Sequence, residues 1–343
     1  MKLAWRIVTA IVAFVLVLLA AGSVWLIYPG EPGPSQVLRF ERYVLLPRHG
    51  LLNVLDYMNV EGHSLYVGGA SAGSVIRVGL GPGSFQVSEW LGGEGRVHGI
   101  AIAGSRDLAF ATRSETNTVD VFSPSRLTRL GGIAVPTDPD AILYDPRHDL
   151  IYVANGDTGV ATLIDPSTRT KVGAIALGGK LEFAALDPLS GLVYQNIESS
   201  GEIAAVDLGK RRVVGRWSLK PCEGPTGLAI DVAVRRAFIV CGKSAQLVVF
   251  DLDRDRVVTS LKIGWGPDAV AFDPGLKRIY ATGLGGQVSV TAQLGADTYK
   301  NLDIVSTHFA AHTLAVDLRT HEVFVGYAAL VVPPRIAVFT SAE

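Results

Sequence analysis

The chain repeats itself with a period of 42 or 44 residues, and this period constrains the fold more than any other feature of the sequence. The repeat is anchored by one aromatic residue per copy, separated by steps of 44, 42, 42, 44, 42 and 44 residues: Tyr66, Phe110, Tyr152, Tyr194, Phe238, Tyr280 and Phe324. A repeated unit of this length cannot bury its own apolar faces, so the copies must pack on one another. Seven such copies indicate a closed array of similar modules.

The secondary structure of one copy is clearest in Pro139–Gly179. Its apolar segments are short, rich in β-branched residues and bounded by Gly, Pro and Asp turns, and none has the spacing of an amphipathic helix. They are Ala141–Tyr144, Leu150–Asn155, Gly159–Asp165 and Lys171–Leu177. Four antiparallel strands in about forty residues are typical of one blade of a β-propeller.

The two ends of the repeat array predict how the propeller closes. The last copy contains three strands, near Thr313–Asp317, Val323–Tyr327 and Arg335–Phe339. A strand-like segment, Val37–Leu46, precedes the first full copy. We therefore predict an all-β, seven-bladed β-propeller over residues 37–343, in which the N-terminal strand completes the last blade and removes an exposed sheet edge.

The first 28 residues differ from the rest of the chain. Lys2 and Arg6 precede Ile7–Tyr28, an uncharged run that would form about 33 Å of helix and could cross a bilayer. We predict one N-terminal transmembrane helix, with a cleaved signal sequence ending near Ala20-Ala21-Gly22 as the alternative, and a linker over residues 29–36. The expected location is the bacterial inner membrane, with the membrane itself as a partner and the propeller on the outer, periplasmic side.

Cys222 and Cys241 are the two cysteines of the chain. One precedes the inner strand of blade five and the other ends the next strand, so both should lie on the same face of the propeller. Because an exported chain meets an oxidising environment, we predict a disulfide between them, with two buried thiols as the alternative.

Charge and motifs exclude several classes of function. The formal net charge is −1 and charges of both signs are scattered, so the chain lacks the basic face that binds nucleic-acid backbones. A groove for single-stranded nucleic acid stays a second alternative only. Gly69–Gly73 spells G-x-S-x-G, but it lies in a predicted turn with no helix behind it. No haem motif or dinucleotide loop is present, so we expect neither haem nor a nucleotide cofactor.

One set of equivalent positions carries candidate binding residues. At the start of each inner strand, the repeat alignment places four carboxylates, two imidazoles and one hydroxyl: Asp56, His98, Asp140, Glu182, Thr226, Asp268 and His312. Equivalent positions of seven blades form a ring at one mouth of the central channel. A structural, water-filled mouth is one interpretation, and a binding site for a small polar ligand or a cation is another. If the ring holds a divalent metal, the best ligands are Asp56, His98 and His312.

The repeat resembles a known propeller family. Tyr152-Val153-Ala154-Asn155, followed by Val160–Asp165 and Gly178-Gly179, is similar to the YVTN-type repeat. Longer strings, such as Val97–Ala101 and Pro221–Asp231, resemble the YncE-like group of bacterial exported propellers. The resemblance implies a periplasmic or cell-surface propeller and supplies no catalytic motif. We predict a binding or scaffold module for a protein, small polar ligand or cation. The alternative is a metal-dependent, lactonase-like hydrolase, so enzyme activity is left open.

Overall fold

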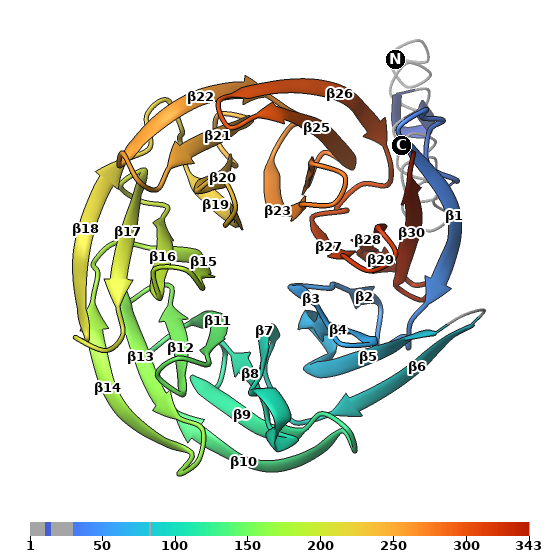
Figure 1. Ribbon diagram of the computed structural model, residues 1–343. Helices are drawn as coiled ribbons and strands as arrows, with labels where there is room; N and C mark the ends of the chain where they lie inside the picture. Colours follow the sequence, from blue (N-terminus) through green and yellow to red (C-terminus); the bar gives the residue numbers. More distant parts are fainter. Residues whose placement is uncertain (1–10, 15–29, 82–83, 343) are drawn as a thin grey trace, which may run out of the picture.

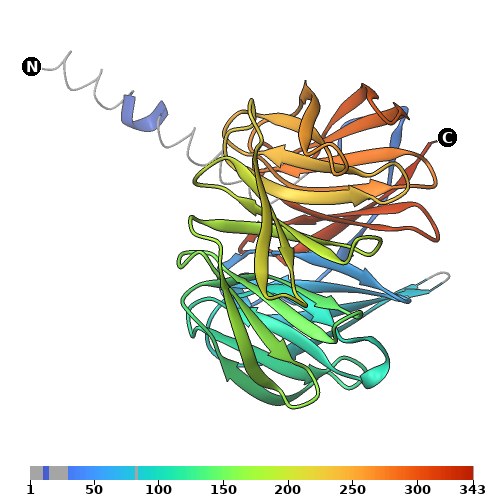
Figure 2. The same cartoon turned by 60° about the vertical axis from the view of Figure 1, so that its left-hand side comes forward.

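The computed structural model describes residues 11–14, 30–81 and 84–342. Its main body is a ring of seven four-stranded antiparallel sheets around a central channel (Figure 1). The sheets follow one another in chain order, which confirms the predicted seven-bladed β-propeller. Figure 2 shows the strands of each blade running between the two faces of the ring. We call the face on which the inner strands begin the upper face, and the face on which they end the lower face.

Six blades are built from consecutive strands, listed here from the channel outward. Blade one contains β3 (Met58–Glu61), β4 (Ser64–Gly69), β5 (Ser74–Gly81) and β6 (Ser84–Leu91). Blade two contains β7 (Val97–Ile102), β8 (Ala109–Arg113), β9 (Thr118–Ser123) and β10 (Thr128–Ala134). Blade three contains β11 (Pro139–Asp145), β12 (Leu150–Asn155), β13 (Val160–Asp165) and β14 (Thr170–Ala176). Two short 3-10 helices lie in turns of these blades, Ala70–Ala72 between β4 and β5 and Gly104–Arg106 between β7 and β8.

The second half of the ring keeps the same order. Blade four contains β15 (Leu181–Asp187), β16 (Leu192–Ile197), β17 (Glu202–Asp207) and β18 (Arg212–Ser218). Blade five contains β19 (Pro225–Asp231), β20 (Arg236–Cys241), β21 (Gln246–Asp251) and β22 (Arg256–Lys262). Blade six contains β23 (Pro267–Asp273), β24 (Arg278–Gly283), β25 (Gln287–Gly295) and β26 (Thr298–Ser306).

Blade seven joins the two ends of the chain, as the sequence predicts. Its strand order is β1-β30-β28-β27, with bounds Leu38–Leu45, Arg335–Ser341, Glu322–Tyr327 and Thr313–Asp317. The outermost strand β1 pairs antiparallel to β30, from Leu38 opposite Ser341 to Leu45 opposite Arg335. A two-stranded sheet of β2 (Leu52–Asn53) and β29 (Ala329–Leu330) adds a second link between blades one and seven. With β1 in place, blade seven has four strands like the other six blades.

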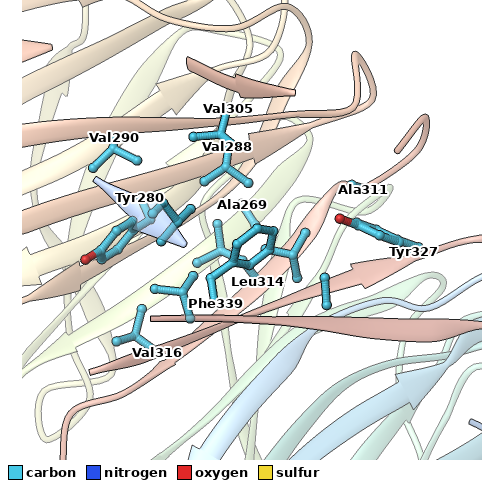
Figure 3. Packing of buried hydrophobic residues seen from close by; sticks show 14 residues of the cluster. Ala269, Tyr280, Val288, Val290, Val305, Ala311, Leu314, Val316, Tyr327 and Phe339 are labelled. Atoms are coloured by element: carbon cyan, nitrogen blue, oxygen red, sulfur yellow. The ribbon is translucent and has the colours of Figure 1, made fainter. Parts of the chain in front are cut away.

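The core consists of apolar layers between neighbouring blades. All seven repeat aromatics are buried, and Tyr152, Phe110, Phe238 and Tyr280 are 0% exposed. Figure 3 shows the layer between blades six and seven, in which Tyr280 and Val290 pack with Leu314 and Phe339. Leu38 of β1 belongs to the same layer, so the N-terminal strand is bound by packing as well as by hydrogen bonds. Burial of each such side chain contributes about 1.5–3 kcal/mol to folding.

The predicted disulfide is confirmed. Cys222, in the loop before β19, is bonded to Cys241 at the end of β20, and their Cα atoms are 5.4 Å apart. The bond therefore fastens the upper loop of blade five to its second strand. The loop contains the cis peptide bond Lys220-Pro221.

The predicted membrane segment lies almost entirely outside the described residues. Within Ile7–Tyr28 the structure describes only residues 11–14, which are helical. Among the residues that are described, no helix has the length and apolar character needed to cross a membrane.

Candidate functional site

The ring residues predicted from the repeat lie where the inner strands begin, at the upper mouth of the channel. Five of them, His98, Asp140, Glu182, Thr226 and Asp268, are each the second residue of an inner strand. Asp56 lies two residues before β3 of blade one, and His312 directly precedes β27 of blade seven. In blades two to six the strand register is broken at these positions. Such β-bulges re-aim side chains and occur often beside active sites. The bulges explain how a channel-facing position can be polar while the rest of each inner strand packs between blades.

His98 is the most highly connected member of the ring. Its Nδ1 lies 2.7 Å from Asp56 Oδ2 and 3.7 Å from Asp140 Oδ1, and its Nε2 lies 2.8 Å from Ser114 Oγ. Burial alone would lower the pKa of His98. The hydrogen bond to Asp56, together with the negative charges of Asp56, Asp140 and Asp138, outweighs burial and raises the pKa to about 9. The imidazole therefore carries a positive charge at neutral pH.

Raised pKa values are found at Asp140, Glu182 and Asp268, which are partly buried and close to other acids. Burial, and then the charge of Asp56, raise the pKa of Asp140 well above its ordinary value. Burial raises the pKa of Glu182 to about 7, although Lys180 opposes the shift. Burial also raises the pKa of Asp268 to about 6, with His312 opposing it. A cation bound among these acids would be stabilised, because its charge offsets both the cost of burying the carboxylates and their mutual repulsion.

Two aromatic rings cross the channel beside these carboxylates. Tyr57 and Phe183 stack with their ring centroids 4.2 Å apart and their planes inclined by 26°. They follow Asp56 and Glu182 in sequence and belong to blades one and four, which lie on opposite sides of the channel (Figure 1). Burial and then the charges of all four ring carboxylates raise the pKa of the Tyr57 hydroxyl. The stack thus forms an aromatic floor to the acidic mouth.

The floor was not predicted from the sequence. The available signal is that two of the seven ring residues are followed directly by an aromatic side chain, Tyr57 and Phe183. The repeat alignment gives the height of these residues in the channel, but it does not indicate that they reach one another from opposite blades.

Glu182 and Thr226 make different kinds of contact. Lys180 Nζ lies 2.6 Å from Glu182 Oε1 and 2.7 Å from Glu198 Oε2, so Glu182 shares a cationic partner with a second acid of blade four. The Thr226 hydroxyl donates to the Pro267 carbonyl at 3.1 Å and lies 3.3 Å from that of Val240. Its hydroxyl is therefore used in joining blades five and six.

The three predicted metal ligands are distributed over two pairs. His98 contacts Asp56, whereas His312 Nδ1 lies 3.5 Å from Asp268 Oδ2. Each imidazole thus pairs with the acid of the preceding blade. Across the part of the chain that the structure describes, no group of three or more His, Cys, Asp or Glu side chains is arranged to hold a metal ion.

Comparison with known proteins supports the fold. No protein-family profile and no curated protein sequence matches the chain. Among solved structures, it is similar to the hydrazine synthase of Kuenenia stuttgartiensis, with a TM-score of 0.70 and 15% identity. The match covers 81% of this chain and 94% of that one. At this identity the likeness establishes the β-propeller fold alone, and the resemblance to the YVTN-type, YncE-like group stays a prediction from sequence.

Proposed function

We propose that this chain is an exported, membrane-anchored β-propeller that acts as a binding module and takes a small organic cation at the upper mouth of its channel. The observation that carries the proposal is the arrangement of four carboxylates around an aromatic floor. Tyr57 stacks on Phe183. The pKa of its hydroxyl is raised by burial and by the negative charges of all four ring carboxylates, Asp56, Asp140, Glu182 and Asp268. Hydrogen bonding within the protein does not require this concentration of acids in one channel.

The chemistry of the mouth suits an ammonium group. A cation held among half-buried carboxylates gains more than it would at an exposed surface, because water screens the charges less. The faces of Tyr57 and Phe183 can add a cation–π contribution of about 0.5–2 kcal/mol. An organic cation also fits acids that are spread over several blades better than a metal ion does, because a metal ion needs ligands within about 2–2.6 Å. A lysine side chain of a partner protein carries the same charge.

The test is a calorimetric titration of choline, spermidine and zinc into the full-length chain, with glycerol as the uncharged control. We expect at least one organic cation to bind, and the double variant Glu182→Gln/Asp268→Asn to weaken its affinity at least tenfold. Asp157→Asn is the matched control, because Asp157 is an exposed acid in the upper turn between β12 and β13. Equal binding by all three proteins, or none at all, would contradict the proposal.

The pH dependence of binding gives a second check. Glu182 and Asp268 have pKa values of about 7 and about 6, so both take up protons as the pH falls from 8 to 5. Binding of a permanently charged cation such as choline should weaken over that range. An affinity that does not change between pH 8 and 5 would show that these two carboxylates are not in the site.

The proposed location is supported by the sequence of Lys2, Arg6 and the apolar run Ile7–Tyr28. The full-length chain should stay with the membranes after an alkaline carbonate wash, and protease added to spheroplasts should degrade the propeller. A chain released by carbonate, or protected until the cells are lysed, would contradict this location.

A further inference from the structure

We infer that Asp56, His98 and Ser114 form a nucleophilic site for acyl transfer, in a pocket between blades one and two. The inference goes beyond cation binding and rests on a different set of contacts. Nδ1 of His98 is 2.7 Å from a carboxylate oxygen of Asp56, and Nε2 is 2.8 Å from the hydroxyl oxygen of Ser114. Nucleophilic serines use this chain of acid, imidazole and hydroxyl, which is recognised by geometry and not by order in the sequence.

Three separate segments bring these groups together. Asp56 precedes β3 of blade one, His98 lies in the irregular start of β7, and Ser114 directly follows β8. Ser114 is itself fixed, because its backbone N–H donates to the Arg96 carbonyl and its own carbonyl accepts from Asn117. Both nitrogens of His98 are therefore oriented by partners that the local backbone holds in place.

A pocket of about 550 Å³ opens beside this chain of hydrogen bonds. Asp56 and His98 line it, together with Glu115, the neighbour of Ser114 in sequence. One part of its remaining wall is apolar, with Leu52, Val54, Ala70 and Ala72. The rest is polar or backbone and consists of Ser71, Glu94, Arg96 and the glycines Gly73, Gly93 and Gly95. A volume of this size accommodates a small molecule. The short apolar side chains on one part of the wall suit the alkyl or acyl group of such a molecule, and the polar part suits its ester oxygens. The substrate class that fits is a short-chain carboxylic ester.

The reaction needs only the ester and water. Ser114 Oγ forms a bond to the ester carbonyl carbon while its proton passes to His98 Nε2. The bond between that carbon and the alkoxy oxygen breaks, and the alkoxide leaves with the proton from Nε2. Water then attacks the acyl-serine, again through Nε2, and releases the carboxylic acid and free Ser114. Asp56 stabilises the imidazolium that forms in each half of the cycle.

The charges around His98 determine the conditions of the test. Burial lowers the pKa of His98, but the hydrogen bond to Asp56 and the negative charges of Asp56, Asp140 and Asp138 outweigh it and raise that pKa to about 9. An imidazole accepts the serine proton only when it is neutral. The assay is therefore run at pH 9.5.

The experiment uses a fluorophosphonate probe, which forms an Oγ–P bond with an activated serine and releases fluoride. Full-length protein is incubated with the probe, and the modified residue is identified by mass spectrometry. We expect labelling at Ser114, its loss in Ser114→Ala, and a labelling rate at least 100-fold lower in His98→Gln. Ser199→Ala is the control, because Ser199 lies on the same face and its hydroxyl accepts a hydrogen bond from the backbone N–H of Lys180. This variant should be labelled at Ser114 at the wild-type rate.

Several outcomes would overturn the inference. Ser114 left unlabelled in the wild type, or labelled at the same rate in folded His98→Gln, would show that the hydroxyl only orients the imidazole. If His98→Gln melts more than 10 °C below the wild type, Asp56→Asn replaces it, with the same expected loss of labelling rate. Failure here leaves cation binding intact, since that proposal is tested through Glu182 and Asp268, which belong to blades four and six.

Discussion

At the lower ends of the inner strands, aspartates are buried and hydrogen-bonded to turns, whereas at the upper ends carboxylates are half-buried and face one another. The lower set is Asp145, Asp187, Asp231, Asp273 and Asp317, none of them more than 5% exposed. Each accepts a hydrogen bond from the backbone N–H two residues later. Several also contact the next blade, as Asp187 does with Arg235 at 2.6 Å and Asp273 with His321 at 2.7 Å.

The two sets show that burial alone does not decide how a carboxylate behaves. Burial would raise the pKa of Asp187, but hydrogen bonds from Ser190 and Arg235 outweigh it and lower the pKa. Glu182 is less buried, yet its pKa is raised to about 7, since burial and neighbouring acids outweigh its one cationic partner, Lys180. Asp187 therefore stabilises the fold as an anion, whereas Glu182 is destabilised as an anion. A carboxylate in a cleft whose charged form destabilises the fold is a candidate for a functional group.

The largest effect should come from breaking a lower contact. Asp187→Ala removes the turn hydrogen bonds and leaves the Arg235 side chain, 15% exposed, with the largely exposed Asp253 as its remaining carboxylate partner. We expect the free energy of unfolding to fall by about 4 kcal/mol. Urea denaturation measures it. Asp253→Ala removes the other partner of Arg235 and should cost less than about 1 kcal/mol. Similar losses in the two variants would break the distinction between buried and exposed partners.

His98 should contribute stability with the opposite pH dependence to that of a lower aspartate. Its pKa rises from 6.5 to about 9 on folding, so its contribution is complete below pH 6.5 and is lost as the pH rises through 9. This contribution is about 3 kcal/mol, and His98→Gln should remove it. The measurement is the melting temperature at pH 6 and pH 10. A difference between wild type and variant that is the same at both pH values would contradict the assigned pKa.

Glu182 should show a smaller effect with the same pH dependence as His98, but here the substitution should stabilise the protein. Because folding raises its pKa from 4.5 to about 7, wild-type stability should fall as the pH rises from about 4.5 to 7. Glu182→Gln removes this loss and should make the protein more stable at pH 8, by about 2 kcal/mol after a discount for solvent screening at this partly exposed site. Melting curves at pH 4.5 and pH 8 test the sign. A variant that is less stable than the wild type at pH 8 would place Glu182 with the structural carboxylates.

Most of the fold could be predicted from the sequence, because each blade contributes the same buried positions to the core at a constant spacing. Tyr152 and its equivalents are spaced by the length of one blade, and all are buried. The missing fourth strand of blade seven implied the role of β1, and the position of Cys222 and Cys241 on one face implied their disulfide. These features depend on equivalence between repeats, which a single sequence displays.

The site was predicted only in outline, because its contacts are those in which the repeats differ. Alignment placed Asp56 and His98 in one ring, but the partner of each imidazole depends on side-chain orientation at a β-bulge. Ser114 lies outside the ring positions and enters the site through a turn. The stack of Tyr57 on Phe183 joins blades that are far apart in sequence. None of these contacts leaves a periodic pattern.

The central claim is that carboxylates at the two ends of the inner strands have opposite environments, and a carbon-13 NMR titration of the side-chain carboxyl groups tests it most directly. Glu182→Gln, Asp268→Asn and Asp187→Asn assign the three resonances. The account predicts midpoints of about 7 for Glu182 and about 6 for Asp268, and a midpoint below 3.8 for Asp187. Midpoints below 5 for all three carboxyl groups would contradict it.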